Sequence, residues 1–470
     1  MFLRLRAALI LTAAILAITL AFRVSRSTSV HAASTKQNPV AQNAVNKVTT
    51  GEQIFRFDTF GDEAFWGNTL KLHQAIEGAA LGGVGPGVSP KTALAVGLKV
   101  DVDALPSNLL QQILHGQVDL NDPAVTLALF KLNAVVGLTG FFNSSGTLQS
   151  VGIQCALCHS TVDDSRPTLC FGQTTPNPGT GCIGHRLDGW PNRDLNVGGI
   201  VALAPDLSVI ANLLNTSQST VRTVLNSWGP GKFDAELLMD GKAFNPQQIT
   251  DGVVTGTNVP GASLIPPAFG LGGVNLHTWI GWGSVPHWNA FVANLDMHGV
   301  GRFFDPRLNN AAQFPIAAAN GFGDLPHINP DNDLVTSKLA ALQLYQLAIP
   351  SPNPTVPVDQ AAAARGDALF SGKAGCNNCH AEPLWTEPGW NLHQPSEVCI
   401  DGFQANRGPD LRYRTSPIGA ISTHFKDGFY HDGRFADLNA VVDHYNTCMN
   451  LGLTASEKSD LVQYLLSLKF

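Results

Sequence analysis

The stretches CALCH (155–159) and CNNCH (376–380) decide how this chain is interpreted. Both follow the pattern C-x-x-C-H, in which two thiols lie about one helical turn apart and a histidine follows at once. Such a pair forms thioethers with the two vinyl groups of a haem, and the adjoining imidazole then ligates the iron. Because the motif occurs twice, the sequence predicts two covalently bound haem c groups. The residues concerned are Cys155, Cys158, His159, Cys376, Cys379 and His380.

Two other interpretations of paired cysteines are weaker. A zinc site would need the two pairs brought together, and it gives no reason for a histidine after each pair. A thioredoxin-type redox pair normally opens a helix after a strand. The residue pattern predicts no strand before either motif, so we favour haem attachment over both alternatives.

The composition indicates a large, loop-rich and mainly helical protein. The chain has 470 residues, of which 44% are hydrophobic and 14% charged, enough for a sizeable core. It contains 46 Gly and 29 Pro, which predicts long irregular segments between the helices. The formal net charge is −7, with no run rich in Lys or Arg, so a nucleic-acid partner is not indicated. We expect a mainly α protein with two cytochrome c-like haem domains, the first enlarged.

The N-terminus is typical of an export signal. Arg4 and Arg6 precede the apolar run 7–22, which suits a signal peptide and is short for a membrane span. Small residues at Ala32 and Ala33 follow, so we expect a signal peptide over 1–32 and a periplasmic or secreted protein without a membrane span after cleavage. Arg23 and Arg26 lie after the apolar run and leave an uncleaved anchor as the alternative.

The remaining chain divides by composition. We expect a disordered leader (33–50), an N-terminal haem domain with large insertions (51–349), a Pro-rich linker (350–358) and a C-terminal cytochrome c domain (359–470). Apolar periodicity predicts helices at 61–78, 109–114, 123–136, 207–228, 337–349 and from 365. Thr454 and Glu457 form a capping box that opens a last helix. Its apolar stripe is Leu461, Tyr464, Leu465 and Leu468.

Four cysteines lie outside the motifs. Cys170 and Cys182 flank a short loop rich in Pro and Gly, and Cys399 and Cys448 are the other two. In an oxidising compartment we expect Cys170–Cys182 and Cys399–Cys448 disulfides. Free buried thiols are the alternative.

The segment YRTSPIGAISTHFKDGFYHDGRFADLNAVVDHYN (413–446) resembles the C-terminal haem domain of bacterial diheme cytochrome c peroxidases and MauG-type diheme enzymes. The resemblance implies a peroxidase-like oxidoreductase, in which peroxide or O2 is activated at the first haem. The second haem would relay electrons from, or to, a small soluble partner such as a cytochrome. Hydrogen peroxide or another small molecule would be the substrate. A non-catalytic diheme electron-transfer cytochrome and a diheme oxygenase acting on an organic substrate are the alternatives.

The same resemblance implies ligands for the second iron. The family keeps its sixth ligand fourteen positions after the histidine of the H-D-G stretch, and counting from His431 gives Tyr445. His444 and Met449 compete for this position, and Tyr445 is alternatively a packing residue. His431 is expected near the second haem without ligating the iron.

The resemblance also makes a calcium site doubtful. The family's calcium lies between the domains, and its Thr and Pro ligands are replaced here by Lys426 and Gly428. A lysine side chain does not ligate calcium, which prefers oxygen donors.

The far side of the first haem is less defined. His185, His287, Met297 and His298 are the candidate ligands, and an open position is the alternative. His298 ranks first because the segment 279–299 is dense in Trp, His and Met, and an aromatic core with satisfied histidines is the alternative for this segment. The family has an acid–base side chain near this haem, but the sequence assigns no residue to that role.

The repeated motif yields a direct test. Mass spectrometry of the mature protein should give the mass of the chain plus two haems, and haem staining should survive denaturation because thioethers are covalent. Replacing Cys376 and Cys379 together by Ala should remove one haem and keep the other. A mass corresponding to one haem or to bound zinc in the unaltered protein would contradict the prediction.

Overall fold

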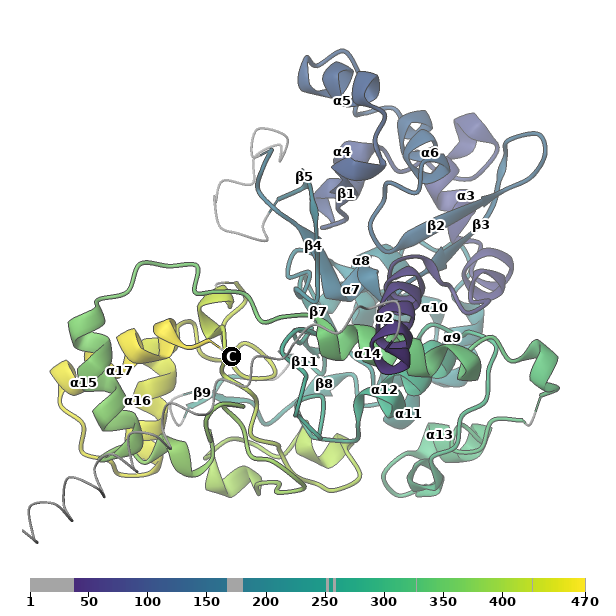
Figure 1. Ribbon diagram of the computed structural model, residues 1–470. Coiled ribbons are helices and arrows are strands. Elements are labelled where there is room, and N and C mark those ends of the chain that lie inside the picture. The colour runs from purple at the N-terminus through teal and green to yellow at the C-terminus, as the bar shows by residue number, and fades with distance from the viewer. Residues whose placement is uncertain are drawn as a thin grey trace, which may run out of the picture. The chain divides into compact units, whose positions relative to one another are not determined.

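Helices form most of the regular structure of the chain (Figure 1), which confirms the mainly α fold class. The computed structural model describes residues 38–166, 181–250, 253–256, 259–326, 328–424 and 426–469. The chain divides into two compact units, Met1–Asn46 and Lys47–Phe470, and the second unit contains both C-x-x-C-H motifs. None of the helices in the described ranges is both long enough and apolar enough to cross a membrane.

Apart from α2, which has 19 residues, the helices before the linker are short. They are α2 (Pro39–Phe57), α3 (Leu72–Glu77), α4 (Pro90–Ala95), α5 (Ser107–Leu114), α6 (Pro123–Lys131), α7 (Ala156–His159), α8 (Val197–Val201), α9 (Ser208–Leu213), α10 (Gln218–Ser227), α11 (Leu237–Asp240), α12 (Val285–Phe291), α13 (Pro315–Asn320) and α14 (Leu339–Ala348). Their starts follow local chemistry: Asp122, for example, caps α6 by accepting a hydrogen bond from the amide of Ala124.

The N-terminal leader differs from expectation. Helix α2 begins at Pro39, so the expected disorder of 33–50 is wrong from that residue onward. Asn38 accepts hydrogen bonds from the amides of Val40 and Ala41 and starts the helix, a signal that the polar composition hid. Residues 33–37 lie outside the described ranges.

The helix expected over 61–78 is interrupted. A π-helix covers Ala64–Thr69 and α3 follows, because Lys71 adopts a left-handed backbone with φ of 56°. The helix expected over 123–136 ends at Lys131, and Asn133 is left-handed with φ of 50°. The segment 207–228 forms the helix pair α9 and α10.

The strands pair in twos among the described residues. The pairs are β1 (Val100–Asp101) with β5 (Ile183–Gly184), β2 (Leu138–Phe142) with β3 (Leu148–Ile153), β4 (Ser160–Val162) with β6 (Arg186–Asp188), β7 (Lys232–Phe233) with β12 (Ser263–Leu264), β8 (Phe244–Asn245) with β11 (Val259–Pro260), and β9 (Ile249–Thr250) with β10 (Val253–Val254). Only β1 and β5 run parallel in this set.

The β2–β3 hairpin corrects the expectation that no strand precedes the first motif. Strand β3 ends at Ile153, two residues before Cys155. Asn143 closes the turn by accepting hydrogen bonds from the amides of Ser145 and Thr147. A register shift at Phe141 and Phe142 breaks the alternation of apolar and polar residues that would have predicted the strand.

After the linker, three helices pack together: α15 (Gln360–Ser371), α16 (Leu438–Cys448) and α17 (Ala455–Ser467) (Figure 1). The capping box of Thr454 and Glu457 is present at the start of α17. All four residues of the predicted stripe are buried, and the Tyr464 ring lies 5.2 Å from the Phe370 ring of α15. Residues 350–358 contain no helix or strand.

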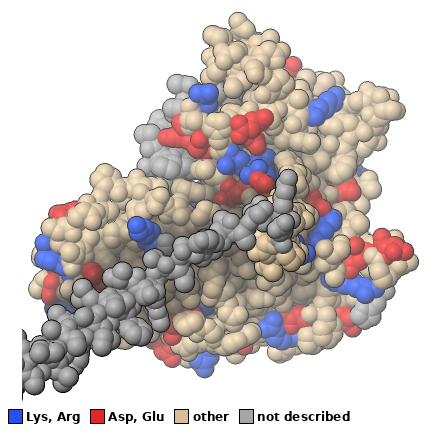
Figure 2. Space-filling model, in the orientation of Figure 1, with Lys and Arg blue, Asp and Glu red and all other residues tan. Residues whose placement is uncertain are grey.

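On the visible part of the face in Figure 2, uncharged residues predominate, and several Lys and Arg side chains lie next to Asp and Glu near its centre. The described residues visible there form no continuous basic area of the kind that binds a phosphate backbone.

The contact between α15 and α17 gives a stability test. A Cβ atom at Gly366 would lie 2.2 Å from the backbone oxygen of Asp460, so the two helices must separate to admit a side chain. Gly366→Ala should destabilise the protein by about 1–3 kcal/mol, measured as a lower melting temperature of the haem-loaded protein. Ala364→Ser on the exposed face of α15 is the control. An unchanged melting temperature for Gly366→Ala would show that the helices do not meet this closely.

Candidate functional site

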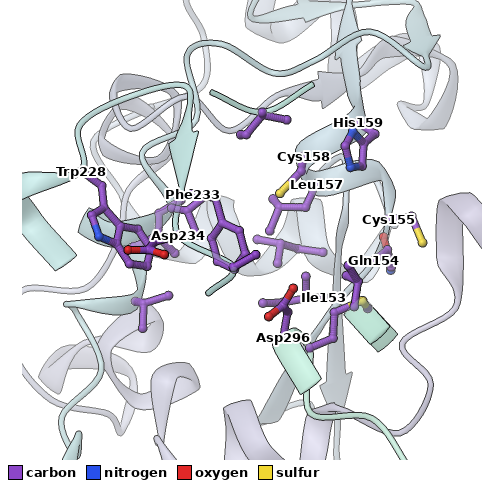
Figure 3. A pocket seen from close by; sticks show the side chains of 18 of the residues that line it. Ile153, Gln154, Cys155, Leu157, Cys158, His159, Trp228, Phe233, Asp234 and Asp296 are labelled. Atoms are coloured by element: carbon purple, nitrogen blue, oxygen red, sulfur yellow. The ribbon is translucent and has the colours of Figure 1, made fainter. Parts of the chain in front are cut away.

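The first motif lies in the interior of the protein. Strand β3 leads into Cys155, and α7 carries Cys158 and His159. The two residues between the thiols, Ala156 and Leu157, are 0% and 4% exposed. Cys155, Cys158 and His159 line a cavity of about 340 Å³, which we call the first cavity (Figure 3).

The imidazole of His159 is oriented by a backbone carbonyl. Its Nδ1 lies 3.1 Å from the oxygen of Pro266, and because a carbonyl only accepts, Nδ1 carries the proton. Nε2 therefore keeps its lone pair. Burial lowers the pKa of His159 to about 4, which keeps the ring neutral. A neutral imidazole with its second nitrogen bonded to a carbonyl is the form that ligates a metal.

The second motif has the same arrangement, two thiols and a histidine held by a backbone carbonyl, in a separate cavity. Cys376, Cys379 and His380 line a space of about 650 Å³, the second cavity. The Nδ1 of His380 donates to the backbone oxygen of Trp385 at 2.9 Å, and burial lowers the pKa of His380. In contrast to the first motif, the residues between the thiols, Asn377 and Asn378, are exposed.

The donor set fits covalent haem at both positions. All four motif thiols are free, and each pair lies beside a mostly apolar cavity together with a neutral, oriented imidazole. Burial raises the pKa of Cys155 and Cys158 to about 12, whereas a redox pair needs a readily formed thiolate. The two pairs line different cavities, so they do not form a common zinc site. Because β3 precedes the first motif, the high pKa of its thiols, and not a missing strand, speaks against a thioredoxin-type redox pair.

One further group of possible metal ligands occurs in the described part of the chain. Cys379, Glu387 and His393 lie close enough to share an ion. However, His393 is already held between two carboxylates, with Nε2 2.5 Å from Glu387 and Nδ1 2.9 Å from Glu397. The group is therefore satisfied without a metal.

The second cavity gathers several of the predicted ligands. Tyr445 on α16, Met449 and His431 all line it, whereas His444 does not. The Nε2 of His444 bonds to the backbone oxygen of Val398 at 2.8 Å instead. Met449 is 46% exposed, and Tyr445 is enclosed near the thiols of the motif, so Tyr445 remains our predicted ligand.

His431 and the cysteines outside the motifs occupy defined positions. The His431 ring is buried and stacks on Tyr413, with ring centroids 5.3 Å apart. Cys399 and Cys448 are joined by a disulfide that links α16 to the preceding loop. Cys170 lies outside the described residues, so its pairing with Cys182 stays a prediction.

Two of the four candidates for the far side of the first haem do not reach the first cavity. His185 is solvent-exposed and pairs with Asp103, Nδ1 to Oδ1 3.0 Å. His287 packs in an aromatic cluster with its Nε2 3.0 Å from Asp305. Both expectations are wrong, because each ring has a carboxylate partner elsewhere.

Met297 and His298 do line the first cavity. The His298 ring stacks on Phe65 with centroids 3.7 Å apart, and burial lowers its pKa to about 4. Its backbone is left-handed, with φ of 62°, at the end of a π-helix over Val292–Asp296. His298 therefore stays a candidate.

Sequence reasoning missed three carboxylates that line the first cavity: Asp234, Glu236 and Asp296 (Figure 3 labels the two aspartates). Burial raises the pKa of all three, that of Glu236 to about 7. Gln404 donates to Glu236 Oε1 at 3.1 Å, and Oε2 has no hydrogen-bond partner among the described residues. The available signal was weak: two acids within the apolar stretch 233–239 and one within 291–297.

Some residues line both cavities. Trp279 and Arg414 do so, with Pro266, Pro267 and Leu271. The indole Nε1 of Trp279 donates to the backbone oxygen of Leu264 at 2.9 Å, which fixes the ring between the two spaces.

Lys426 occupies a position where the family resemblance implies a calcium ligand. Lys426 forms a close ion pair with Asp194, and Lys99 binds the same carboxylate with its Nζ at 2.6 Å. Two ammonium groups therefore satisfy the acid, and Lys426 is not a cation ligand.

Comparisons with known proteins bear on the resemblance. No family model matches the chain. It is 29% identical to the cytochrome-c peroxidase IdrP1 of Denitromonas iodatirespirans, over 34% of this chain and 55% of that protein. It is 32% identical to the methylamine utilization protein MauG of Methylorubrum extorquens, over 18% of this chain and 25% of that protein. The chain thus spans about half of the first relative and a quarter of the second.

Two solved structures are also similar. A MauG-like protein associated with microbial copper homeostasis is 19% identical over 48% of this chain and 77% of its own, with a TM-score of 0.29. The diheme peroxidase BthA from Burkholderia thailandensis E264 is 15% identical over 52% and 78%, also with a TM-score of 0.29. These scores carry no argument about the fold. The predicted resemblance to diheme cytochrome c peroxidases and MauG is confirmed by the curated relatives.

The position of Tyr445 gives a spectroscopic test. Tyr445→Phe should leave both haems attached, because the thioethers and His380 are untouched, and should change the absorption and paramagnetic resonance spectra of one haem. Met449→Leu, which alters the competing ligand, is the matched variant and should leave the spectra unchanged. A change with Met449→Leu and none with Tyr445→Phe would assign the ligand to the thioether.

Proposed function

We propose that this chain is an exported diheme c-type cytochrome that acts as a peroxidase-like oxidoreductase. Peroxide or O2 would react in the first cavity, and electrons would pass through the second. The observation that carries the proposal is the asymmetry of two otherwise matching sites. Each has two free thiols and a histidine held by a carbonyl, but the residues between the thiols are buried in the first motif and exposed in the second. The first cavity is lined by Glu236, whose Oε2 has no hydrogen-bond partner among the described residues, whereas the carboxylates that line the second, Asp194 and Glu397, are paired with Lys and His side chains.

The bound haem would supply the redox-active iron, with His159 and His380 as its protein ligands. Reduction of hydrogen peroxide to two waters consumes two electrons and two protons, so a proton-transferring group is needed beside the substrate. Glu236 suits this role because burial raises its pKa to about 7, so that it exchanges a proton near neutral pH. Gln404 orients the carboxyl group by its hydrogen bond to Oε1.

Electrons would enter at the second motif. Its exposed Asn377 and Asn378 bring this attachment site to the surface, where a small soluble donor such as a cytochrome can approach. Trp279 lines both cavities and offers the route onward to the first. The resemblance to peroxidases supports this direction of transfer, and the opposite direction belongs to the electron-carrier alternative.

Export is part of the proposal. The apolar run 7–22 after two arginines is typical of a signal peptide, and covalent haem is attached outside the cytoplasm. The Cys399–Cys448 disulfide supports an oxidising compartment such as the periplasm or the cell exterior.

A second candidate function is oxygenation of an apolar organic molecule in the first cavity. The observation that favours it is the lining of that cavity, which includes many aliphatic side chains from the enlarged first part of the chain. Examples are Ile76 on α3, Leu94 on α4 and Leu129 on α6. Spectral shifts on adding apolar molecules, with O2 consumption, would distinguish this function from peroxide reduction.

The acid–base role of Glu236 is testable by kinetics. Peroxide turnover with a reduced cytochrome or dye should rise as pH increases through about 7, because the carboxyl group must lose its proton before it can accept one. Glu236→Gln should lower kcat/KM by about 10²–10⁴-fold and abolish that rise, with both haems retained. Glu52→Gln, at a residue that lines neither cavity, is the control.

Other outcomes reassign the function. Full activity in Glu236→Gln together with loss in Asp296→Asn would move the role to Asp296. If peroxide leaves the spectra of the oxidised and half-reduced protein unchanged and no turnover occurs, the chain is an electron carrier.

A further inference from the structure

We propose that Arg414 and Arg193 form a carboxylate-binding site inside the protein, in which Arg414 binds a propionate of each haem and Arg193 binds a propionate of the second haem only. This inference rests on the proposed diheme function and adds the groups that anchor the cofactors and set their electrostatics.

Four arginines inside the protein divide into two kinds. Arg407 and Arg434 are buried and are bound by carboxylates, Arg407 by Asp240 and Asp234, and Arg434 by Asp432 and Asp401. Arg414 and Arg193 are half-buried beside the cavities, and neither has a carboxylate oxygen within 4.0 Å in the described part of the chain. A guanidinium without a counter-ion is costly to bury, so a completed site should contain an anion beside each.

Arg414 lines both cavities and has N–H groups without hydrogen-bond partners among the described residues. Its Nη1 donates to the backbone oxygen of Leu276 at 2.6 Å, and its enclosed Nε has no partner among the described residues. Its Nη2 is neither enclosed nor hydrogen-bonded to a described residue, and is the donor open to a ligand. The backbone of Arg414 is fixed by a hydrogen bond from its amide to the oxygen of Trp279 at 3.2 Å. Arg414 lines both cavities, so one guanidinium is available to groups bound in either.

Arg193 has the same property in the second cavity alone. Its Nε and Nη1 both lack hydrogen-bond partners among the described residues, and it lines the second cavity but not the first. The charge of Asp427 stabilises the charged form of Arg193, but no ion pair forms between them among the described residues. The third nitrogen, Nη2, forms no hydrogen bond with the described residues and is not enclosed, so it is the donor available to a ligand.

The chemistry of the ligand follows from the donors. A planar guanidinium with several N–H groups matches a carboxylate, which accepts two parallel hydrogen bonds. The motif cysteines and histidines of both cavities fit haem, and each haem carries two propionate carboxylates. Those carboxylates are the anions that the protein itself does not supply to Arg414 and Arg193.

The assignment has a measurable consequence. A positive charge beside a haem favours the reduced state, since reduction adds an electron, so removing the charge should lower the reduction potential. Arg414 should act on both haems because it lines both cavities, and Arg193 on one.

The test is a spectroelectrochemical titration of the haem-loaded protein without peroxide. Arg414→Gln should shift the reduction equilibrium of both haems about tenfold toward the oxidised form, which is ~59 mV for a one-electron couple. Arg193→Gln should shift one haem by a similar factor and leave the other unchanged. Arg412→Gln is the matched control, because Arg412 is next but one in the chain and lines neither cavity.

Unchanged potentials in Arg414→Gln, or equal shifts in Arg412→Gln, would overturn the inference, as would a lower melting temperature without any shift. If Arg414→Gln does not fold, Arg414→Lys is the second variant, because it keeps the charge but changes the hydrogen-bonding geometry. Its redox difference infrared spectrum should show altered propionate bands. Unaltered bands would overturn the inference. The haem count from mass spectrometry separates the two proposals. If the unaltered protein carries two haems but the potentials of the Arg414→Gln variant are unshifted, this inference alone fails. If the unaltered protein carries fewer than two haems, the proposed diheme function fails.

Discussion

The buried ion pair of Arg407 fixes the geometry on which the first cavity depends. Its guanidinium is 0% exposed and is bound by Asp240 at 2.8 and 3.0 Å, by Asp234 at 2.8 Å and by the backbone oxygen of Gly261 at 3.0 Å. Arg407 follows the second motif in the chain, whereas its partners precede the linker. Removing one partner of such a pair costs about 3–5 kcal/mol, because the other charge stays buried. Asp234 also lines the first cavity, so a residue far along the chain holds part of the wall.

The same interaction explains why the carboxylates of the first cavity escaped prediction. Asp234 and Glu236 belong to no motif, and their role emerges only in the fold, where both line the cavity that His159 also lines. There Arg407 binds Asp234 and Gln404 binds Glu236. Asp296 comes from yet another segment. The features that were predicted correctly depend on residues close together in the sequence. They are the histidine arrangement at both C-x-x-C-H motifs, the capping box of Thr454, and the buried face of α17.

Other features depended on context that a residue pattern does not contain. The β2–β3 hairpin was missed because its bulge breaks the alternation of side chains, and α2 was missed because its sequence is polar. His185 and His287 were reasonable candidates as histidines, but Asp103 and Asp305 lie beside them in the fold. A histidine's role is set by its partner, and the partner is usually distant in sequence.

The burial of the first motif has a consequence for how the protein is made. Ala156 and Leu157 are enclosed, and Gly137, just before β2, packs so closely on Leu157 that a Cβ there would lie 2.1 Å from its Cα. Under the proposed diheme function, an enzyme that attaches haem would have to reach the backbone segment between Cys155 and Cys158, which the hairpin covers. Attachment at the first motif would then come before the hairpin closes over it, during maturation of a chain that is still open. The second motif, with Asn377 and Asn378 at the surface, imposes no such order.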